Sequence, residues 1–231
     1  MPHVPPPKRH PYDQWSPDAR ALDLVGDKWT LLIVRDLAAG PRRFVELQRV
    51  LPGISTEQLR SRLNRMVADG MLTRQRYREV PPRVDYELTE RARELMPILG
   101  ELARWGYAWA WGPPRASEAV DIGAIFRLAP GMLQVSASLR GTVELTVKGD
   151  EGVQTVYQLI AADGHVMVAE RVAEHADARV IGSIRAWVKA FSPEGDRSSL
   201  EMSGNRKLAG ELLDGLALSA PAAAGADVRA A

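Results

Sequence analysis

The sequence predicts an α+β fold in two parts: a mainly helical front half, and a back half in which helices cover a sheet. Three observations predict it. Up to Trp111, most apolar residues recur at the three- and four-residue spacing of amphipathic helices. Gly112-Pro113-Pro114 then interrupts the pattern, because neither residue type continues a helix. From Asp121 onward, alternating apolar residues between glycine-containing turns predict strands.

These breaks divide the chain of 231 residues into five segments. Residues 1–14 are rich in proline and polar groups and are expected to form a flexible arm. Residues 218–231 are largely Ala, Gly and Pro and are expected to be a disordered tail. Between them we expect a helical domain over residues 15–112, a linker over 113–120 and a sheet-and-helix domain over 121–217.

Four short helices are expected in the front half, over about residues 17–25, 28–39, 43–51 and 56–69. Ser16-Pro17 gives the first helix an N-cap and a proline at its first position. Ser55 and Gln58 fit a capping box, which fixes the start of the fourth. Gly26 and Gly70 end these two helices.

A β-hairpin is expected directly after the fourth helix. Its apolar runs are Met71-Leu72-Thr73 and Val84-Asp85-Tyr86-Glu87-Leu88, and between them lies Arg78-Glu79-Val80-Pro81-Pro82-Arg83. A long helix from about Thr89 to Trp111 follows, with a kink expected at Pro97. The order helix, strand, basic turn, strand is that of a winged helix-turn-helix, in which one helix enters a DNA groove and the turn reaches the neighbouring backbone.

The back half is expected to form one antiparallel sheet with two or three helices on one face. The expected strands lie within residues 132–147, 153–161, 165–169, 178–181 and 199–203, and the expected helices within 183–191 and 207–216. Gly149-Asp150-Glu151-Gly152 and Asp163-Gly164 are typical of hairpin turns.

Charge is distributed unevenly along the chain. Residues 1–115 hold 19 Lys and Arg against 14 Asp and Glu, a net +5, and residues 116–231 hold 11 against 15, a net −4, which together give the +1 of the whole chain. Residues 41–93 contain twelve arginines and no lysine. A preference for arginine throughout the chain explains the residue type but not the clustering. We therefore expect the front half alone to contact a polyanion.

The fourth helix has an apolar side and a polar side. Leu59, Leu63 and Met66 share the apolar side, and the arginine, glutamine and serine side chains opposite can read base edges or phosphate. The alternative is an ordinary core helix with a solvated charged face. The start of the third helix suits phosphate, because its N–H groups are free. The expected DNA-contacting residues are Arg42, Arg43, Thr56, Gln58, Ser61, Arg62, Arg65, Arg76, Arg78 and Arg83.

Residues 12–112 resemble the HxlR-type bacterial regulators. The resemblance is carried by Ala19-Arg20-Ala21-Leu22-Asp23-Leu24-Val25-Gly26-Asp27-Lys28-Trp29-Thr30, Gly40-Pro41-Arg42-Arg43-Phe44, Leu47-Gln48, Pro52-Gly53-Ile54-Ser55, Leu59, Arg62-Leu63, Gly70-Met71-Leu72 and Val80-Pro81-Pro82-Arg83-Val84-Asp85-Tyr86-Glu87-Leu88-Thr89. It implies a winged-helix homodimer, often a repressor, that binds near-palindromic double-stranded operators. Many relatives carry a cysteine where this chain has Ser16, so thiol sensing at that position is excluded here.

In the HxlR-type family the first and last helices usually make the dimer contacts. The last expected helix has an apolar stripe at heptad spacing, which agrees with that role. The alternative is that the stripe packs against its own domain. The dimer residues expected from the resemblance and the stripe are Leu22, Leu95, Ile98, Leu102, Trp105 and Trp109.

Residues 118–217 resemble a sterol-carrier-type (SCP2-like) domain. The resemblance rests on Leu139-Arg140-Gly141-Thr142-Val143-Glu144-Leu145, Ala176-Asp177-Ala178-Arg179-Val180-Ile181-Gly182 and Leu200-Glu201-Met202-Ser203-Gly204-Asn205. It implies an apolar cavity for a hydrophobic effector, with Trp187 as the best candidate to stack on it. The alternative for each such residue is plain core. The expected lining residues are Phe126, Leu133, Tyr157, Met167, Ile184, Trp187, Val188, Phe191, Leu208 and Leu212.

Several other classes of function are disfavoured by what the sequence lacks. There is no cysteine, so disulfides and thiolate chemistry are excluded, and the four histidines are scattered. No phosphate-binding glycine loop, Gly-x-Ser-x-Gly or His-Glu-x-x-His motif occurs. We therefore expect no enzyme, cofactor or metal. No apolar run approaches the roughly 18 residues of a membrane helix, and no signal peptide begins the sequence, so no membrane partner and a cytoplasmic location are expected.

Three hypotheses remain for the whole chain. The leading one is a transcriptional regulator, expected to be a dimeric repressor, whose back domain binds a hydrophobic small-molecule effector. In the second, the back domain serves protein partner binding or oligomerisation. In the third, it is a lipid carrier or an enzyme.

Overall fold

The computed structural model describes residues 11–78, 83–149 and 152–217. The chain divides into two compact units, with the boundary in the sequence between Met96 and Pro97. Most of the expected arm, the tip of the expected hairpin at 79–82, part of the turn at 149–152 and the expected tail lie outside the described residues. No helix within the described ranges is long and apolar enough to cross a membrane.

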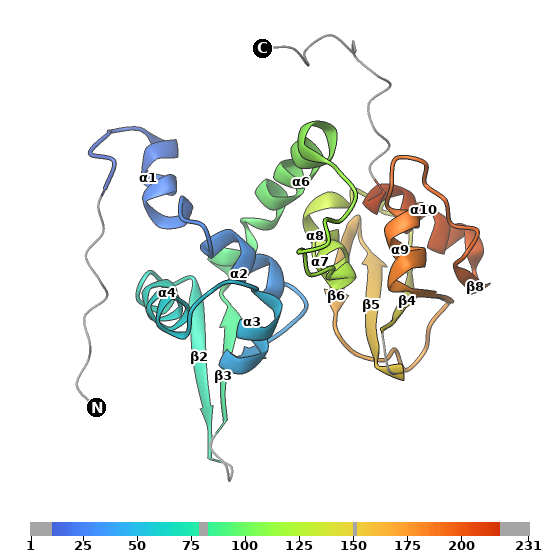
Figure 1. The fold of residues 1–231 in the computed structure, drawn as a ribbon, viewed down its shortest axis with the longest axis horizontal. Helices are drawn as coiled ribbons and strands as arrows, with labels where there is room; N and C mark the ends of the chain where they lie inside the picture. Colours follow the sequence, from blue (N-terminus) through green and yellow to red (C-terminus); the bar gives the residue numbers. More distant parts are fainter. Residues whose placement is uncertain (1–10, 79–82, 150–151, 218–231) are drawn as a thin grey trace. The chain divides into compact units, whose positions relative to one another are not determined.

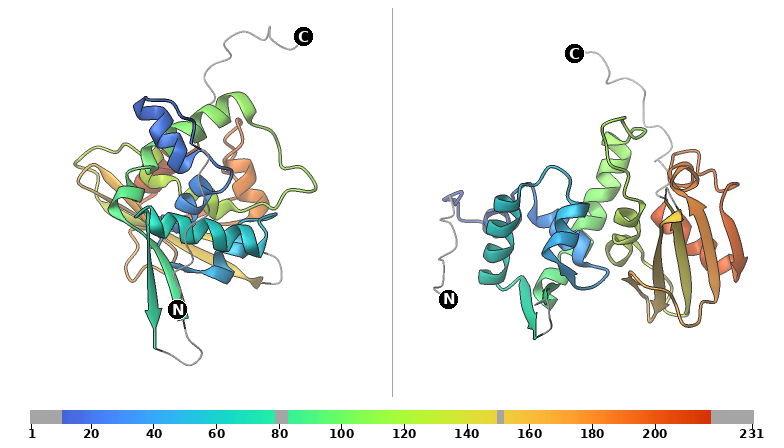
Figure 2. Two further views of the ribbon diagram at one scale, coloured as in Figure 1. Left: turned by 90° about the vertical axis from the view of Figure 1, so that its left-hand side faces the viewer. Right: turned by 60° about the horizontal axis from the view of Figure 1, so that its bottom comes forward.

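The N-terminal unit has the order of elements that the sequence predicts (Figure 1). Its elements are α1 (Pro17–Val25), α2 (Thr30–Leu37), β1 (Arg42–Arg43), α3 (Phe44–Val50), α4 (Thr56–Ala68), β2 (Leu72–Tyr77), β3 (Arg83–Leu88) and α5 (Glu90–Arg93). The strands form an antiparallel sheet in the order β1-β3-β2. The β2–β3 hairpin extends beyond the helices (Figure 2). This arrangement confirms the predicted winged helix-turn-helix.

Local hydrogen bonds explain where α1 and α4 begin. The Ser16 hydroxyl accepts a hydrogen bond from the Ala19 N–H at 3.2 Å. At α4 the Gln58 N–H donates to the Ser55 hydroxyl, and the Ser55 N–H donates to Gln58 Oε1, both at 3.1 Å. Both predicted caps are confirmed. Because each satisfies N–H groups that a helix leaves unpaired, they define the starts of these helices.

Asp27, in the turn before α2, connects that turn with α4. Its carboxylate accepts hydrogen bonds from the Trp29 N–H at 2.8 Å and the Thr30 N–H at 3.1 Å, as well as from the Thr30 hydroxyl. The same carboxylate lies 2.9 Å from Arg62 Nη1, with both side chains about three-quarters buried. Asp27 therefore caps α2 and fixes α4 against it.

The long last helix expected from Thr89 to Trp111 is two helices, α5 and α6 (Met96–Ala110). The break falls before Pro97, which occupies the second position of α6. Proline is tolerated in a first turn because the N–H that it lacks would have no partner there. The expected kink at Pro97 is therefore a helix start. α6 packs within the C-terminal unit, so the compact unit begins earlier in the chain than the expected linker at 113–120.

The C-terminal unit is a mixed five-stranded sheet with helices on one face (Figures 1 and 2). After α6 come α7 (Ile122–Phe126), α8 (Ala129–Met132), β4 (Gly141–Lys148), β5 (Gln154–Ala162), β6 (His165–Ala169), β7 (Ala178–Ser183), α9 (Ile184–Ala190), β8 (Glu201–Gly204) and α10 (Arg206–Leu216). The strand order is β6-β5-β4-β7-β8.

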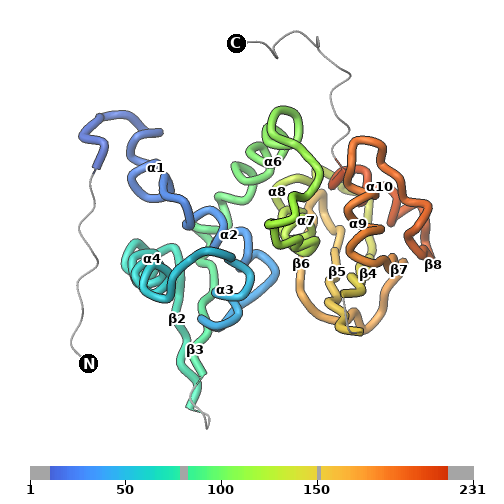
Figure 3. The backbone as a smooth tube through the Cα atoms, viewed as in Figure 1, coloured from blue at the N-terminus to red at the C-terminus, as the bar shows by residue number. Residues whose placement is uncertain are grey.

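Two expectations for this sheet are wrong. The first part of the strand expected over 132–147 does not form, because α8 extends to Met132 and the strand β4 begins only at Gly141. The sheet is also not wholly antiparallel, since β4 and β7 pair in parallel. Residues 170–177 make the crossover that this pairing requires (Figure 3). Buried Glu144 holds the crossover by accepting from the Ala173 N–H at 2.9 Å and from Arg179 Nε at 3.2 Å.

Replacing Asp27 with alanine is expected to destabilise the N-terminal unit. The substitution leaves two N–H groups of α2 without their acceptor and Arg62 without its partner, which we expect to lower the free energy of unfolding by about 2 kcal/mol. Asp27→Asn keeps an acceptor and is expected to cost about half as much.

Chemical denaturation of the full chain measures both effects, with exposed Glu94→Ala, just after α5, as the control. An unfolding midpoint for Asp27→Ala equal to that of the control would contradict the role given to this carboxylate.

Candidate nucleic-acid interface

The outward face of α4 carries Glu57, Arg60 and Asn64, which are exposed, with Ser61 and Arg65 half-buried beside them. Leu59 and Leu63 are fully buried on the opposite side of the helix. Among the described residues, the side chains of this face form one loose ion pair, in which Arg60 Nη1 lies 4.0 Å from Glu57 Oε2. The outward face thus offers hydrogen-bonding side chains of the kind that read base edges.

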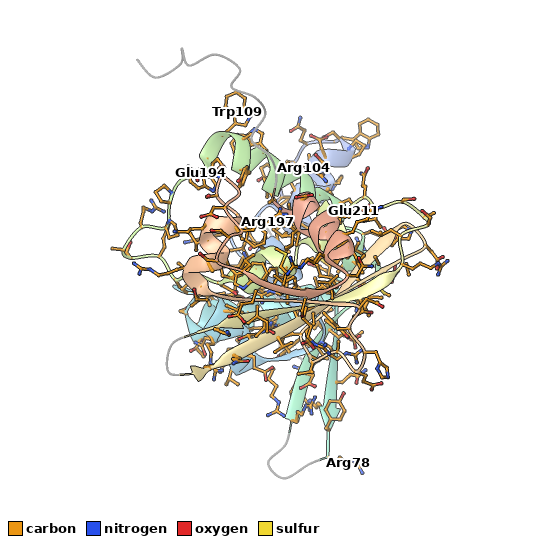
Figure 4. The ribbon with its side chains drawn as sticks, turned by 90° about the vertical axis from the view of Figure 1, so that its right-hand side faces the viewer. Arg78, Arg104, Trp109, Glu194, Arg197 and Glu211 are labelled. Atoms are coloured by element: carbon orange, nitrogen blue, oxygen red, sulfur yellow. The ribbon has the colours of Figure 1, made fainter. Side chains whose placement is uncertain are left out.

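The hairpin carries a row of arginines, Arg74, Arg76 and Arg78, at every second residue. All three are exposed, and Figure 4 shows Arg78 at the outer end of the hairpin. Alternate residues of a strand project to the same face, so Arg74 and Arg76 share one face of β2. No hydrogen bond or ion pair within the described ranges engages any of these three side chains. They are free to neutralise phosphates.

Three of the expected base-reading side chains on α4 instead have partners inside the unit. Arg62 pairs with Asp27, and the Thr56 hydroxyl accepts from Gln48 Nε2 at 2.8 Å. Gln58 belongs to the capping box that starts the helix. In this structure Arg62, Thr56 and Gln58 thus make internal contacts that help to position α4, and their expected contacts with DNA stay predictions.

Arg83 on the wing is held by its neighbours. Its Nε lies 2.9 Å from both carboxylate oxygens of Asp85, and its guanidinium lies 4.8 Å from the centre of the Tyr77 ring. The hydrogen bonds from Arg83 hold the pKa of buried Asp85 below its usual value, so this carboxylate keeps its charge. Arg83 therefore stabilises the base of the wing, and its expected phosphate contact stays a prediction.

The two arginines before α3 differ from each other. Arg42 is half-buried, and its Nε donates to the Asp36 carbonyl at 2.8 Å, so its side chain stabilises the fold. Arg43 is exposed, and its Nε lies 4.0 Å from Asp85. Of this expected pair, Arg43 remains the one placed to reach phosphate. Arg60 and Arg74 were not among the expected contacts, although the spacing of Arg74 with Arg76 and Arg78 was visible in the sequence.

The stripe on α6 is exposed in the single chain. Ile98 is 55% exposed, Leu102 50%, Trp105 60% and Trp109 75%, and Figure 4 shows Trp109 pointing outward from the helix. Each of these four side chains thus leaves at least half of its surface uncovered in the single chain. Leu95 is half-buried, and Leu22 on α1 is exposed.

Most of the expected ligand-lining residues form the closed core of the C-terminal unit. The Trp187 ring stacks on Phe191 with the ring centres 5.7 Å apart, and its Nε1–H donates to the Thr146 carbonyl at 3.0 Å. Trp187 therefore has no face or donor left for a ligand, which corrects its expected stacking role. The other expected lining residues that are buried in the core are Phe126, Leu133, Tyr157, Leu208 and Leu212.

The remaining expected lining residues lie elsewhere. Met167 is 57% exposed and pairs with Ile160 on the sheet face away from the helices, so it cannot line a cavity under them. Ile184 is half-buried at the start of α9. Only Val188 and Phe191 line an apolar pocket, which is formed with α6, α7 and α10.

A buried arginine, missed by the sequence analysis, lies under the sheet. Arg127 is 1% exposed; its Nη1 donates to the Tyr157 hydroxyl at 2.9 Å, and the guanidinium forms an ion pair with Asp121. Glu170 lies 3.9 Å away. Burial of a charge is tolerated only with such partners. Within the described ranges, no group of three His, Asp or Glu side chains could hold a metal ion.

Comparisons with known proteins agree with this geometry. The HxlR-like helix-turn-helix family model matches residues 24–112. The uncharacterized HTH-type transcriptional regulator BH0655 of Halalkalibacterium halodurans is 44% identical over 94 residues, which are 40% of this chain and 83% of that protein. The regulator sll1512 of Synechocystis sp., of the same description, is 41% identical over 93 residues, which are 40% of this chain and 69% of that protein.

Among solved structures, the redox regulator HypR in its reduced form is 38% identical and covers 39% of this chain and 90% of its own, with a TM-score of 0.38. The two curated relatives are described as regulators, in agreement with the expectation that this chain is not an enzyme. The chain belongs to the HxlR-like helix-turn-helix family, and it is a transcriptional regulator of that type.

Proposed function

We propose that this regulator binds a near-palindromic operator as a dimer and represses transcription from it. In each copy, α4 enters the major groove, and the wing follows the adjacent phosphates. The observation that carries the proposal is that some arginines are paired within the fold and others are not. Arg62 and Arg83 hold the fold together, whereas Arg74, Arg76 and Arg78 project from the wing with no partner within the described ranges.

On α4, the outward side chains supply the proposed base contacts. Arg60 and Asn64 are exposed, and Ser61 and Arg65 lie next to them. Arginine pairs bidentately with guanine and asparagine with adenine in the major groove. Arg43, which is exposed just before α3, adds a phosphate contact.

The exposed stripe on α6 supports pairing of two chains. Ile98, Leu102, Trp105 and Trp109 recur every three or four residues, as a helix that packs against a second helix requires. Leu22 on α1 is a further proposed contact. A two-fold symmetric pair would place two copies of α4 about 34 Å apart, one helical turn of DNA, which is why a palindromic operator is proposed.

The C-terminal unit is proposed to bind a hydrophobic small molecule that controls this pairing. A mixed sheet covered by helices on one face, with an apolar pocket among these helices, supports a ligand-binding role and the proposed likeness of residues 121–217 to sterol-carrier domains.

Removing a wing arginine is expected to weaken DNA binding in a salt-dependent way. With Arg76→Ala, each copy loses one phosphate contact, so the slope of log K against log salt should become shallower by about 0.9 for each copy, or about 1.8 for the dimer. Fluorescence anisotropy with the DNA that flanks this protein's own gene measures the slope.

Arg185→Ala, on the exposed side of α9 in the other unit, is the matched control and should leave the slope unchanged. An unchanged slope for Arg76→Ala as well would place the wing away from the phosphates.

Charging the α6 stripe is expected to separate the dimer. Trp105→Glu places a carboxylate in the proposed apolar interface, where burial of an unpaired charge is costly. Sedimentation velocity should show a monomer and anisotropy a loss of operator affinity of at least about tenfold. Val172→Glu substitutes an equally exposed apolar residue elsewhere and should remain dimeric. If Trp105→Glu has the same sedimentation coefficient as the wild-type chain, the interface lies on another surface.

A further inference from the structure

The C-terminal unit contains an apolar pocket of about 230 Å³. Ala103 and Tyr107 of α6 form one wall, with Trp111 just beyond the end of that helix. Ile125 of α7 and Val188 of α9 form the opposite wall. Cores are packed as densely as organic crystals and leave few voids larger than a water molecule. This pocket is partly open to solvent, and its mainly apolar walls offer space for a small ligand.

The volume limits what the pocket can hold. An apolar cavity of about 150 Å³ accepts benzene, and sites for drug-sized molecules begin near 300 Å³. The present value, about 230 Å³, lies between these limits. The occupant that fits is one aromatic ring with a short substituent, held by contacts with the rings of Tyr107 and Trp111, whose centres are 6.3 Å apart.

The polar groups of the lining determine the charge of that occupant. No Lys, Arg or His lines the pocket, so a carboxylate or phosphate would lie against apolar walls without a counter-charge. The one lining carboxylate, Asp121, is paired with Arg127. The Tyr107 hydroxyl donates to the Phe191 carbonyl at 2.9 Å, and its oxygen can still accept one hydrogen bond. This lining favours a neutral molecule over an anionic one.

The same helix forms the pocket wall and carries the exposed stripe. Tyr107 lies two residues, about 200° around the helix, from both Trp105 and Trp109. One side of α6 therefore faces the pocket, and the other faces the proposed partner. Gly100 packs so closely against α8 that an added Cβ would lie 2.1 Å from the Gly131 carbonyl oxygen. α6 is thus held near its start, and the pocket lies along its second half.

We propose that this pocket is the effector site, that its ligand is a small neutral aromatic molecule, and that α6 transmits occupancy to the dimer. The part of this proposal that concerns transmission through α6 rests on the proposed function. A ligand that binds one arrangement of the paired α6 helices more tightly than another shifts the spacing of the two α4 helices and hence operator affinity.

The test uses a matched pair of fluorinated probes, neutral 4-fluoroacetophenone and anionic 4-fluorobenzoate, with the full-length chain. ¹⁹F NMR titration should show saturable binding of the ketone and at least about tenfold weaker binding of the carboxylate. Ala103→Phe, which fills the pocket from α6, should weaken binding of the ketone at least tenfold. Ala108→Phe, on an exposed position of the same helix, should leave it unchanged. Val188→Phe fills the pocket from the other wall and replaces Ala103→Phe if that variant does not fold.

Operator binding is measured by anisotropy on the same samples, so that failure of the proposed effector site can be distinguished from failure of the proposed function. The proposed site would be overturned if both filling variants still bound the ketone as the wild-type chain does. It would also be overturned if the two probes bound equally well, or if a chain that still binds operator bound neither probe. Ketone binding that the filling variants abolish, with operator affinity unchanged on saturation, would overturn transmission through α6. Ketone binding by a chain that binds no operator would leave the site standing and overturn the proposed function.

Discussion

The position of the DNA-facing helix depends on one ion pair. Asp27 caps the start of α2 through two backbone N–H groups and contacts Arg62 of α4 at 2.9 Å. A helix buried on one side by Leu59 and Leu63 could still rotate or slide, since apolar contacts have little directionality. The hydrogen-bonded pair removes that freedom. With α4 fixed, Arg60 and Asn64 point away from the core, and the wing that follows begins at a defined place.

α6 has two apolar faces, one that lines the pocket and one that is exposed. Tyr107 faces the pocket, and Trp105 and Trp109 are exposed. A helix with only one apolar face needs one partner, whereas this helix has one inside its unit and space for a second. Because α6 follows closely on α5 of the N-terminal unit in the sequence, the proposed transmission runs from its inner face to the proposed dimer interface.

The sequence predicted those features that depend on local rules. The caps at Ser16 and Ser55 and the winged order of elements were predicted, because each depends on residues only a few positions apart. Partners distant in the sequence could not be read in this way. Nothing near Arg62 indicates that it contacts Asp27 rather than a base, and nothing near Trp187 indicates that its N–H is bonded to the Thr146 carbonyl. The parallel pairing of β4 with β7 likewise depends on a crossover whose anchor, Glu144, lies far from it in sequence.

The most direct test of the account is the structure of the chain bound to its operator. The account predicts two copies related by a two-fold axis, with α4 in successive major grooves and Asn64 or Arg60 at base edges. It also predicts Arg74 and Arg76 on phosphates, and Arg62 still paired with Asp27. A complex in which Arg62 leaves Asp27 to contact a base, or in which α4 lies outside the groove, would contradict the assignment of these arginines.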